Sequence, residues 1–144
     1  SRILNRQFRC FRNGGEPMKD LLISVCCMLL LLVPWEIYSS YTAGTMHFCS
    51  DAIDAKVLPA VTQNDWENAK KGFEEVSDQW DHYKKTAVCF LSTEALNEVD
   101  STICKAYYYI QMEDDSNASG EVSALQYQLM YLHENQKPTL ANIL

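Results

Sequence analysis

The sequence predicts an all-α protein, in which an N-terminal transmembrane helix is followed by an antiparallel helical bundle of three to four helices. Two observations lead to this prediction. Residues 21–33 are apolar apart from Ser24, which gives one long hydrophobic run near the N-terminus. Further along, apolar residues recur at alternating spacings of three and four, the period of helices that pack along their length. We expect a basic leader over residues 1–17, an anchor over 18–41 and a bundle over 46–144.

The leader is distinguished by its charge. Residues 1–17 carry four arginines and one glutamate, and Met18-Lys19-Asp20 then introduces the apolar run as a translation start would. The preceding Gly14-Gly15-Glu16 can be encoded by a purine-rich ribosome-binding stretch. We therefore expect residues 1–17 to be a leader outside the native protein. The alternative is a basic cytoplasmic tail.

The anchor is predicted from its length and from the aromatic residues that follow it. The 20 residues from Leu21 onward extend about 30 Å at roughly 1.5 Å per residue, which is enough to cross a hydrocarbon core. Trp35, Tyr38 and Tyr41 then provide rings with a polar edge, which favour the lipid–water interface. We expect residues 21–41 to contact membrane lipid. The positive-inside rule places the N-terminus in the cytoplasm and the bundle outside.

Two alternatives to a retained anchor remain open. A 13-residue core that is apolar apart from Ser24 and stands before Pro34 also fits a cleaved signal peptide, and Thr42-Ala43-Gly44 offers small residues for a cleavage site. The bulky aromatic residues after Pro34 argue against cleavage. The second alternative is that the apolar run is a buried core helix.

The strongest bundle helix is predicted to begin at Asn64, a good N-cap, and to carry a heptad pattern as far as Phe90. Upstream, Met46 to about Val61 has a weaker helical pattern with Pro59 near its end. This segment can continue the membrane helix.

Two more helices follow. One begins at Ser92, as its N-cap, and ends at the acidic turn of residues 113–117. The other starts near Asn117 or Ser119 and runs to about Gln136. Short connections make sequential helices antiparallel neighbours. The core positions that we expect are Trp66, Ala69, Phe73, Val76, Trp80, Leu96, Val99, Ile103, Leu125 and Leu129.

The composition excludes several functions. Residues 39–144 contain 16 acidic and 7 basic residues, a net charge of −9, and no arginine. Nucleic-acid binding needs cationic side chains, so we expect none. We recognise no nucleophile-elbow, metalloprotease, phosphate-loop or dinucleotide motif, and therefore expect no enzyme, no catalytic residue and no cofactor. The three histidines, His47, His82 and His133, are spread one per helix without a Glu-x-x-His motif, so we expect no metal site.

Tyrosines are the candidate protein-contact residues. Three of them are consecutive, and consecutive residues point around a helix, so they cannot all be buried. Exposed tyrosines are favoured at protein interfaces because they combine apolar area with a polar tip. Partial burial with a hydrated hydroxyl is the simpler interpretation. The candidate residues are Tyr107, Tyr108, Tyr109, Tyr127 and Tyr131.

The chain after Met18 resembles domain-of-unknown-function family 4363, small single-pass membrane proteins of the Firmicutes. The resemblance depends on the Met18 start, the motif Asn64-Asp65-Trp66-Glu67-Asn68-Ala69, Trp80, the two long helices that follow and the ending Leu140-Ala141-Asn142-Ile143-Leu144. It implies a helical protein of a bacterial cell membrane, beside multi-pass membrane proteins. The family has no established activity, so the resemblance implies no chemistry.

The function that these features favour is that of a membrane-anchored accessory or scaffold protein. It would act through helix-face contacts with another membrane protein or with a second copy of itself. One alternative is a secreted helical binding module released by signal cleavage. Another is a metal-binding bundle protein, which would need polar ligands at core positions that are almost wholly apolar here.

Overall fold

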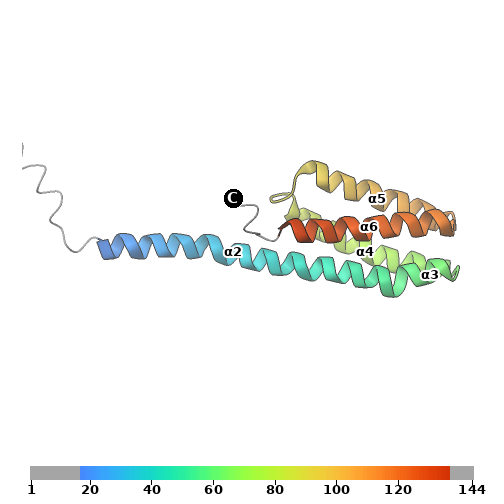
Figure 1. The fold of residues 1–144 in the computed structure, drawn as a ribbon, viewed down its shortest axis with the longest axis horizontal. Coiled ribbons are helices and arrows are strands. Elements are labelled where there is room, and N and C mark those ends of the chain that lie inside the picture. The colour runs from blue at the N-terminus through green and yellow to red at the C-terminus, as the bar shows by residue number, and fades with distance from the viewer. Residues whose placement is uncertain (1–16, 137–144) are drawn as a thin grey trace, which may run out of the picture. The chain divides into compact units, whose positions relative to one another are not determined.

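The structure is a computed structural model that describes residues 17–136. All regular structure in that range is helical, which confirms the predicted fold class (Figure 1). α2, η1 and α3 follow one another without a break, and α4, α5 and α6 come after short turns. The predicted leader lies outside the described residues, apart from Pro17. The elements are α2 (Pro17–Ala52), the π-helical segment η1 (Ile53–Val57), α3 (Leu58–Thr62), α4 (Trp66–Ala87), α5 (Thr93–Gln111) and α6 (Asp115–Gln136).

The chain divides into two compact units, residues 1–38 and residues 39–144. In the described part of the first unit, apolar side chains of α2 are exposed; Leu22 and Leu30, for example, are 68% and 72% exposed. Among residues 17–136, one helix is long and apolar enough to cross a membrane, with a mean hydropathy of 2.2 and 6% of its apolar window buried. The described part of the first unit is therefore an apolar helix of the kind found in signal anchors and signal sequences.

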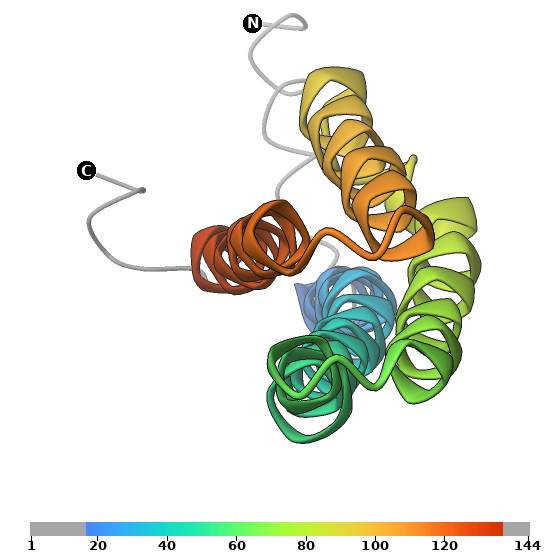
Figure 2. The same ribbon diagram turned by 90° about the vertical axis from the view of Figure 1, so that its right-hand side faces the viewer.

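The second unit is the helical bundle, and it begins before residue 46. Thr42 and Thr45 are already buried, at 1% and 7% exposure. Within this unit α3 packs against α4 and α6, and α5 packs against α4 and α6, so the helices form a closed ring around one core. Figure 2 shows this ring from its end. Consecutive helices α4, α5 and α6 run antiparallel, as predicted from the short connections (Figure 1).

The core follows the predicted heptad positions with few exceptions. All of the expected core residues are buried except Trp66 and Ile103, which are partly buried against the core. Phe90 does not continue the pattern: α4 ends at Ala87, and Phe90 is 53% exposed in the turn toward α5. The chain must reverse direction here, and the turn overrides the apolar spacing.

Helix α4 begins one residue later than the sequence suggested. Asn64 has a φ of 57°, a left-handed conformation that asparagine tolerates, and it lies in the turn. Asp65 is the N-cap, because its side chain accepts a hydrogen bond from the backbone N–H of Asn68. Ser92 caps α5 as predicted, through a bond from the N–H of Ala95.

The π-helical segment precedes Pro59, which explains its position. A proline lacks the N–H that an α-helix needs, and its ring collides with the carbonyl one turn earlier. In η1 the N–H of Leu58 bonds to the oxygen of Ile53, which widens the turn just before the proline. The chain thereby stays helical through Pro59, and α3 ends at Thr62.

Candidate protein-contact surface

The five candidate tyrosines fall into two groups. On α5, Tyr107 and Tyr108 are 47% and 59% exposed, whereas Tyr109 is partly buried against the core. On α6, Tyr127 and Tyr131 are 72% and 57% exposed. The expectation that the run of three could not be wholly buried therefore holds.

The structure does not bring these two groups together. Tyr127 and Tyr131 line a groove with Val99 of α5. Tyr107 lies eight residues further along α5, which corresponds to about 12 Å of helix at roughly 1.5 Å per residue. The α6 pair is thus the better-formed surface, and the α5 tyrosines lie nearer the turn that joins the two helices.

The groove between α5 and α6 is small, and two tyrosines lie along its α6 side. The rings of Tyr127 and Tyr131, one turn apart, are stacked with centroids 6.4 Å apart and planes inclined by 21°. Two exposed rings on one side of α6 offer a partner apolar ring surface and two hydroxyl groups. The groove has a volume of about 260 Å³ and is lined by Ala95, Glu98, Val99, Tyr127, Gln128, Tyr131 and Leu132.

Two polar side chains in the groove had no sequence signal. Gln128 Nε2 donates a hydrogen bond of 3.4 Å to Glu98 Oε1, which joins α6 to α5. Gln128 Oε1 is buried and has no hydrogen-bond partner. A buried acceptor without a partner has lost its solvation and gained no hydrogen bond in return, so it costs the fold free energy. The contacts of Gln128 become apparent only when α6 is packed against α5.

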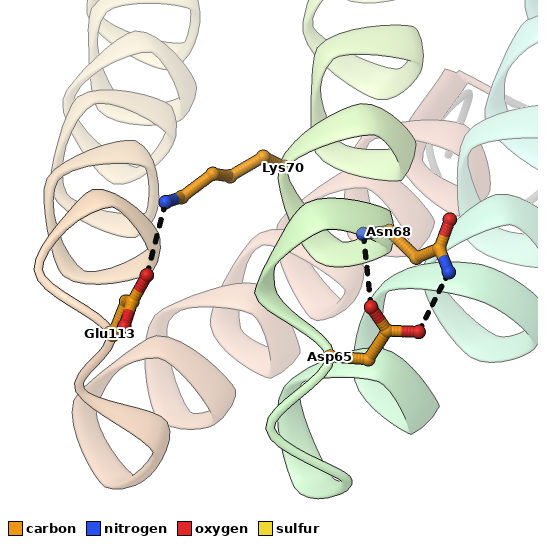
Figure 3. A network of polar contacts seen from close by, with 4 residues as sticks. All are labelled: Asp65, Asn68, Lys70 and Glu113. Carbon is orange, nitrogen blue, oxygen red and sulfur yellow. Dashed lines mark hydrogen bonds and ion pairs between the residues drawn. The ribbon is translucent and has the colours of Figure 1, made fainter.

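Capping contacts position α6 against α5. Asp114 accepts hydrogen bonds from the backbone N–H of Asn117, at 3.1 Å, and from its side-chain amide, at 2.7 Å. The same arrangement starts α4, where Asp65 accepts from the backbone and side chain of Asn68 (Figure 3). Hydrogen bonding from the Asn117 side chain, then from its backbone, lowers the pKa of the Asp114 carboxyl.

The two capped turns are linked to each other. Lys70, in the second turn of α4, forms an ion pair of 3.3 Å with Glu113, which precedes Asp114 (Figure 3). Glu113 has a φ of 58°, the same left-handed geometry as Asn64 before Asp65. The acidic turn that the sequence predicted at residues 113–117 is thereby a structural junction between α4, α5 and α6.

A partly buried polar bridge joins α4 to α5 elsewhere in the bundle. The indole Nε1 of Trp80 donates to Asp100 Oδ1 at 2.8 Å, and Lys84 pairs with the other carboxylate oxygen. Trp80 is 1% exposed. The bridge supplies the hydrogen bond that a buried indole needs, so its role is structural.

A second hollow, of about 420 Å³, lies beside η1, α3 and α4. Its rim carries an ion pair between Lys56 Nζ and Glu75 Oε2, 2.5 Å apart. Both side chains are about half exposed. Gly72 lies beneath, where α4 approaches η1 closely. Charged groups that are solvated and paired with each other make this a hydrated surface rather than an apolar docking site.

The histidines are less scattered than the sequence suggested. His82 is exposed on α4, as is Asp78 one turn before it. His47 and His133, in contrast, meet across α2 and α6 with ring centroids 5.4 Å apart. Within residues 17–136 no group of three or more His, Cys, Asp and Glu side chains is placed to hold a metal ion.

The comparison with protein families identifies the family of this chain but assigns it no activity. The family model described as "Domain of unknown function (DUF4363)" matches residues 39–143, which is the bundle unit as the structure defines it. No curated protein and no solved structure matches the chain. The match covers most of the sequence, and it agrees with the resemblance carried by the Asn64–Ala69 motif and Trp80. The chain is therefore a member of the DUF4363 family.

Proposed function

We propose that this chain is a membrane-anchored accessory or scaffold protein, which binds another membrane protein or a second copy of itself through the groove between α5 and α6. The observation behind the proposal is the exposed pair Tyr127 and Tyr131, which lines the groove between α5 and α6. Exposed aromatic side chains at the edge of a groove fit a partner that supplies apolar side chains for the groove and polar groups for the tyrosine hydroxyls.

Retention of the anchor is supported by the position of the alternative cleavage site. Thr42-Ala43-Gly44 lies inside α2, and Thr42 is 1% exposed. Cleavage there would cut a continuous helix and remove buried residues from the bundle unit. A secreted form would have to fold without them, so the anchored form is the better proposal. It places the bundle outside a bacterial cell membrane, with the N-terminus in the cytoplasm.

A role in binding rather than catalysis is favoured by what fills the bundle. The residues buried among α4, α5 and α6 are almost wholly apolar or aromatic, and the grooves are small and open. The bundle carries a net charge of −9 over residues 39–144, which disfavours contact with nucleic acid.

Site-specific photo-cross-linking in the native membrane tests the proposal. A photoreactive phenylalanine analogue at Tyr127 should capture a protein partner or a second copy, because this position borders the groove. The same analogue at Gln79, an exposed position on α4, is the control and should capture nothing comparable. Equal capture at both positions, or none at Tyr127, would refute the proposed surface.

A matched variant and a mass measurement complete the test. The double change Tyr127→Ala and Tyr131→Ala should abolish co-purification of the captured partner while the bundle keeps its helical circular dichroism, since both rings are exposed. Intact mass of the membrane-extracted protein should show no cleavage near residue 44. A mature form that starts there would establish the secreted alternative instead.

A further inference from the structure

His47 and His133 are the only histidine pair that the described residues bring into ring contact. They come from different helices, 86 positions apart in the sequence. Their ring planes are inclined by 63°. His47 is exposed and His133 is half-buried, so an ion from solvent can reach the pair.

The distance between the rings suits a shared metal ion. A zinc–nitrogen bond of about 2.1 Å, plus about 1.1 Å from nitrogen to ring centre, places each imidazole centroid about 3.2 Å from the ion. Two such ligands at a tetrahedral angle have centroids about 5.2 Å apart. The observed separation is 5.4 Å. The separation of the two centroids therefore matches that of two imidazoles on one ion, once side-chain rotation points a nitrogen of each ring at it.

Neighbouring contacts hold the two helices in the register that the pair requires. One turn from His47 and two turns from His133, Gln126 Nε2 donates a hydrogen bond of 3.1 Å to Ser50 Oγ, which again joins α6 to α2. Ser50 follows His47 by three residues, and Gln126 precedes His133 by seven. Each spacing is close to a whole number of turns, so the bond and the ring pair lie on the same side of each helix.

The surrounding charge favours a cation. Asp51 lies one turn after His47 and is exposed, and Glu134 follows His133 directly. These carboxylates are not required as ligands. They raise the local concentration of cations, as does the net charge of −9 over residues 39–144.

We propose that His47 and His133 form a two-histidine site for a late first-row divalent metal ion such as Zn²⁺, which fastens α2 to the C-terminal part of α6. Imidazole is a good ligand for these ions, and water completes the coordination because only two protein ligands are available. The site lies on the α2 side of α6, whereas the tyrosine groove faces α5, so this inference does not depend on the proposed function.

Calorimetric titration of the full-length protein in mild detergent with Zn²⁺ alone tests the site. Exposed cysteines are first blocked with iodoacetamide, because Cys89 and Cys104 would otherwise compete as thiolates. Wild-type protein should bind one ion per chain. His47→Ala and His133→Ala should each weaken binding by at least about tenfold, because a single imidazole loses the chelate. His82→Ala should stay within about twofold of wild type.

Thermal unfolding supplies an independent readout. Zn²⁺ should raise the Tm of wild type and of His82→Ala, and should leave the Tm of His47→Ala unchanged, because only an ion that binds the folded protein stabilises it. His47 is exposed, so this variant is expected to fold even where His133→Ala does not. Binding and stabilisation by Zn²⁺ that survive in His47→Ala, or that vanish equally in His82→Ala, would overturn the proposal.

Discussion

Replacing Asp100 by alanine is expected to lower the free energy of unfolding of the bundle by about 2–3 kcal/mol, of which most comes from the hydrogen bond to Trp80. Asp100 Oδ1 is the acceptor, at 2.8 Å, for the indole of a tryptophan that is 1% exposed. Without the carboxylate, the N–H of this buried indole loses its hydrogen-bond partner. The substitution therefore removes a contact and also leaves an uncompensated donor inside the core.

The magnitude separates into two parts. A buried donor left without a partner costs about 1–3 kcal/mol. The ion pair between Lys84 and Asp100 contributes less, because the two side chains are 35% and 30% exposed, and pairs that solvent reaches contribute about 0.2–1 kcal/mol. Asp100→Asn keeps an oxygen for Trp80 and loses only the charge, so its cost should be about 1 kcal/mol or less.

Urea unfolding of the full chain in detergent, followed by far-UV circular dichroism and tryptophan fluorescence, measures these differences. Asp81→Ala is the matched control, an exposed carboxylate on α4 whose loss should change stability by less than about 0.5 kcal/mol. The free energy of unfolding of Asp100→Ala should lie well below that of Asp100→Asn, and that of Asp81→Ala should be close to the wild-type value. If Asp100→Ala and Asp81→Ala are equally stable, the polar bridge does not stabilise the bundle and the reasoning fails.

Three further predictions follow from single contacts. Gly120→Ala should stabilise the bundle by about 0.5–1 kcal/mol in the same urea assay, since an added Cβ meets nothing within 4 Å; Gly72→Ala should fall short of that gain, because its Cβ would lie 3.2 Å from the Cβ of Lys56. Burial raises the pKa of the Cys49 thiol from 9.0 to about 11. The contribution of the protonated thiol to the free energy of unfolding is therefore present below pH 9 and is lost as pH rises toward 11. A curve of stability against pH should show this loss for the wild type and should lack it for Cys49→Ala. Because the pKa of Asp114 is lowered in the folded protein, the contribution of its carboxylate to the free energy of unfolding is present above the ordinary pKa of 3.8 and is lost as pH falls through the lower folded pKa. Asp114→Asn should reduce the loss of stability at acid pH, and an unchanged loss would contradict the capping role.

The helices were predictable because their signals are local. Heptad spacing and the Ser92 cap depend on residues within one or two turns, and the structure places α4 and α5 where these signals indicated. The errors occurred where two local signals compete. Asn64 and Asp65 are both good N-caps, and the left-handed backbone at Asn64 decides between them. Phe90 fits the apolar spacing, but the chain turns at Ala87 to bring α5 back along α4.

The candidate sites were predictable only in part, because they depend on how separate helices align. Composition and consecutive positions indicated exposed tyrosines, and these are exposed. No spacing in the sequence indicates that Tyr127 faces Glu98 across a groove, or that His47 meets His133. These neighbours come from the register between helices, and a shift of one residue rotates a side chain by about 100° around its helix.

Helix α6 shows why a helix in a central position of the fold need not be clearly amphipathic. One stripe of α6 enters the core through Leu125 and Leu129, which are fully buried. A second side contacts α2 through Gln126 and His133, and a third meets α5 through Gln128. A helix that makes polar contacts on both flanks of its apolar stripe cannot show the clean division into apolar and polar faces that marks a surface helix. The polar residues on either side of the apolar stripe weaken the helical periodicity of the sequence. They also lie at the tyrosine groove on one side of α6 and at the histidine pair on the other.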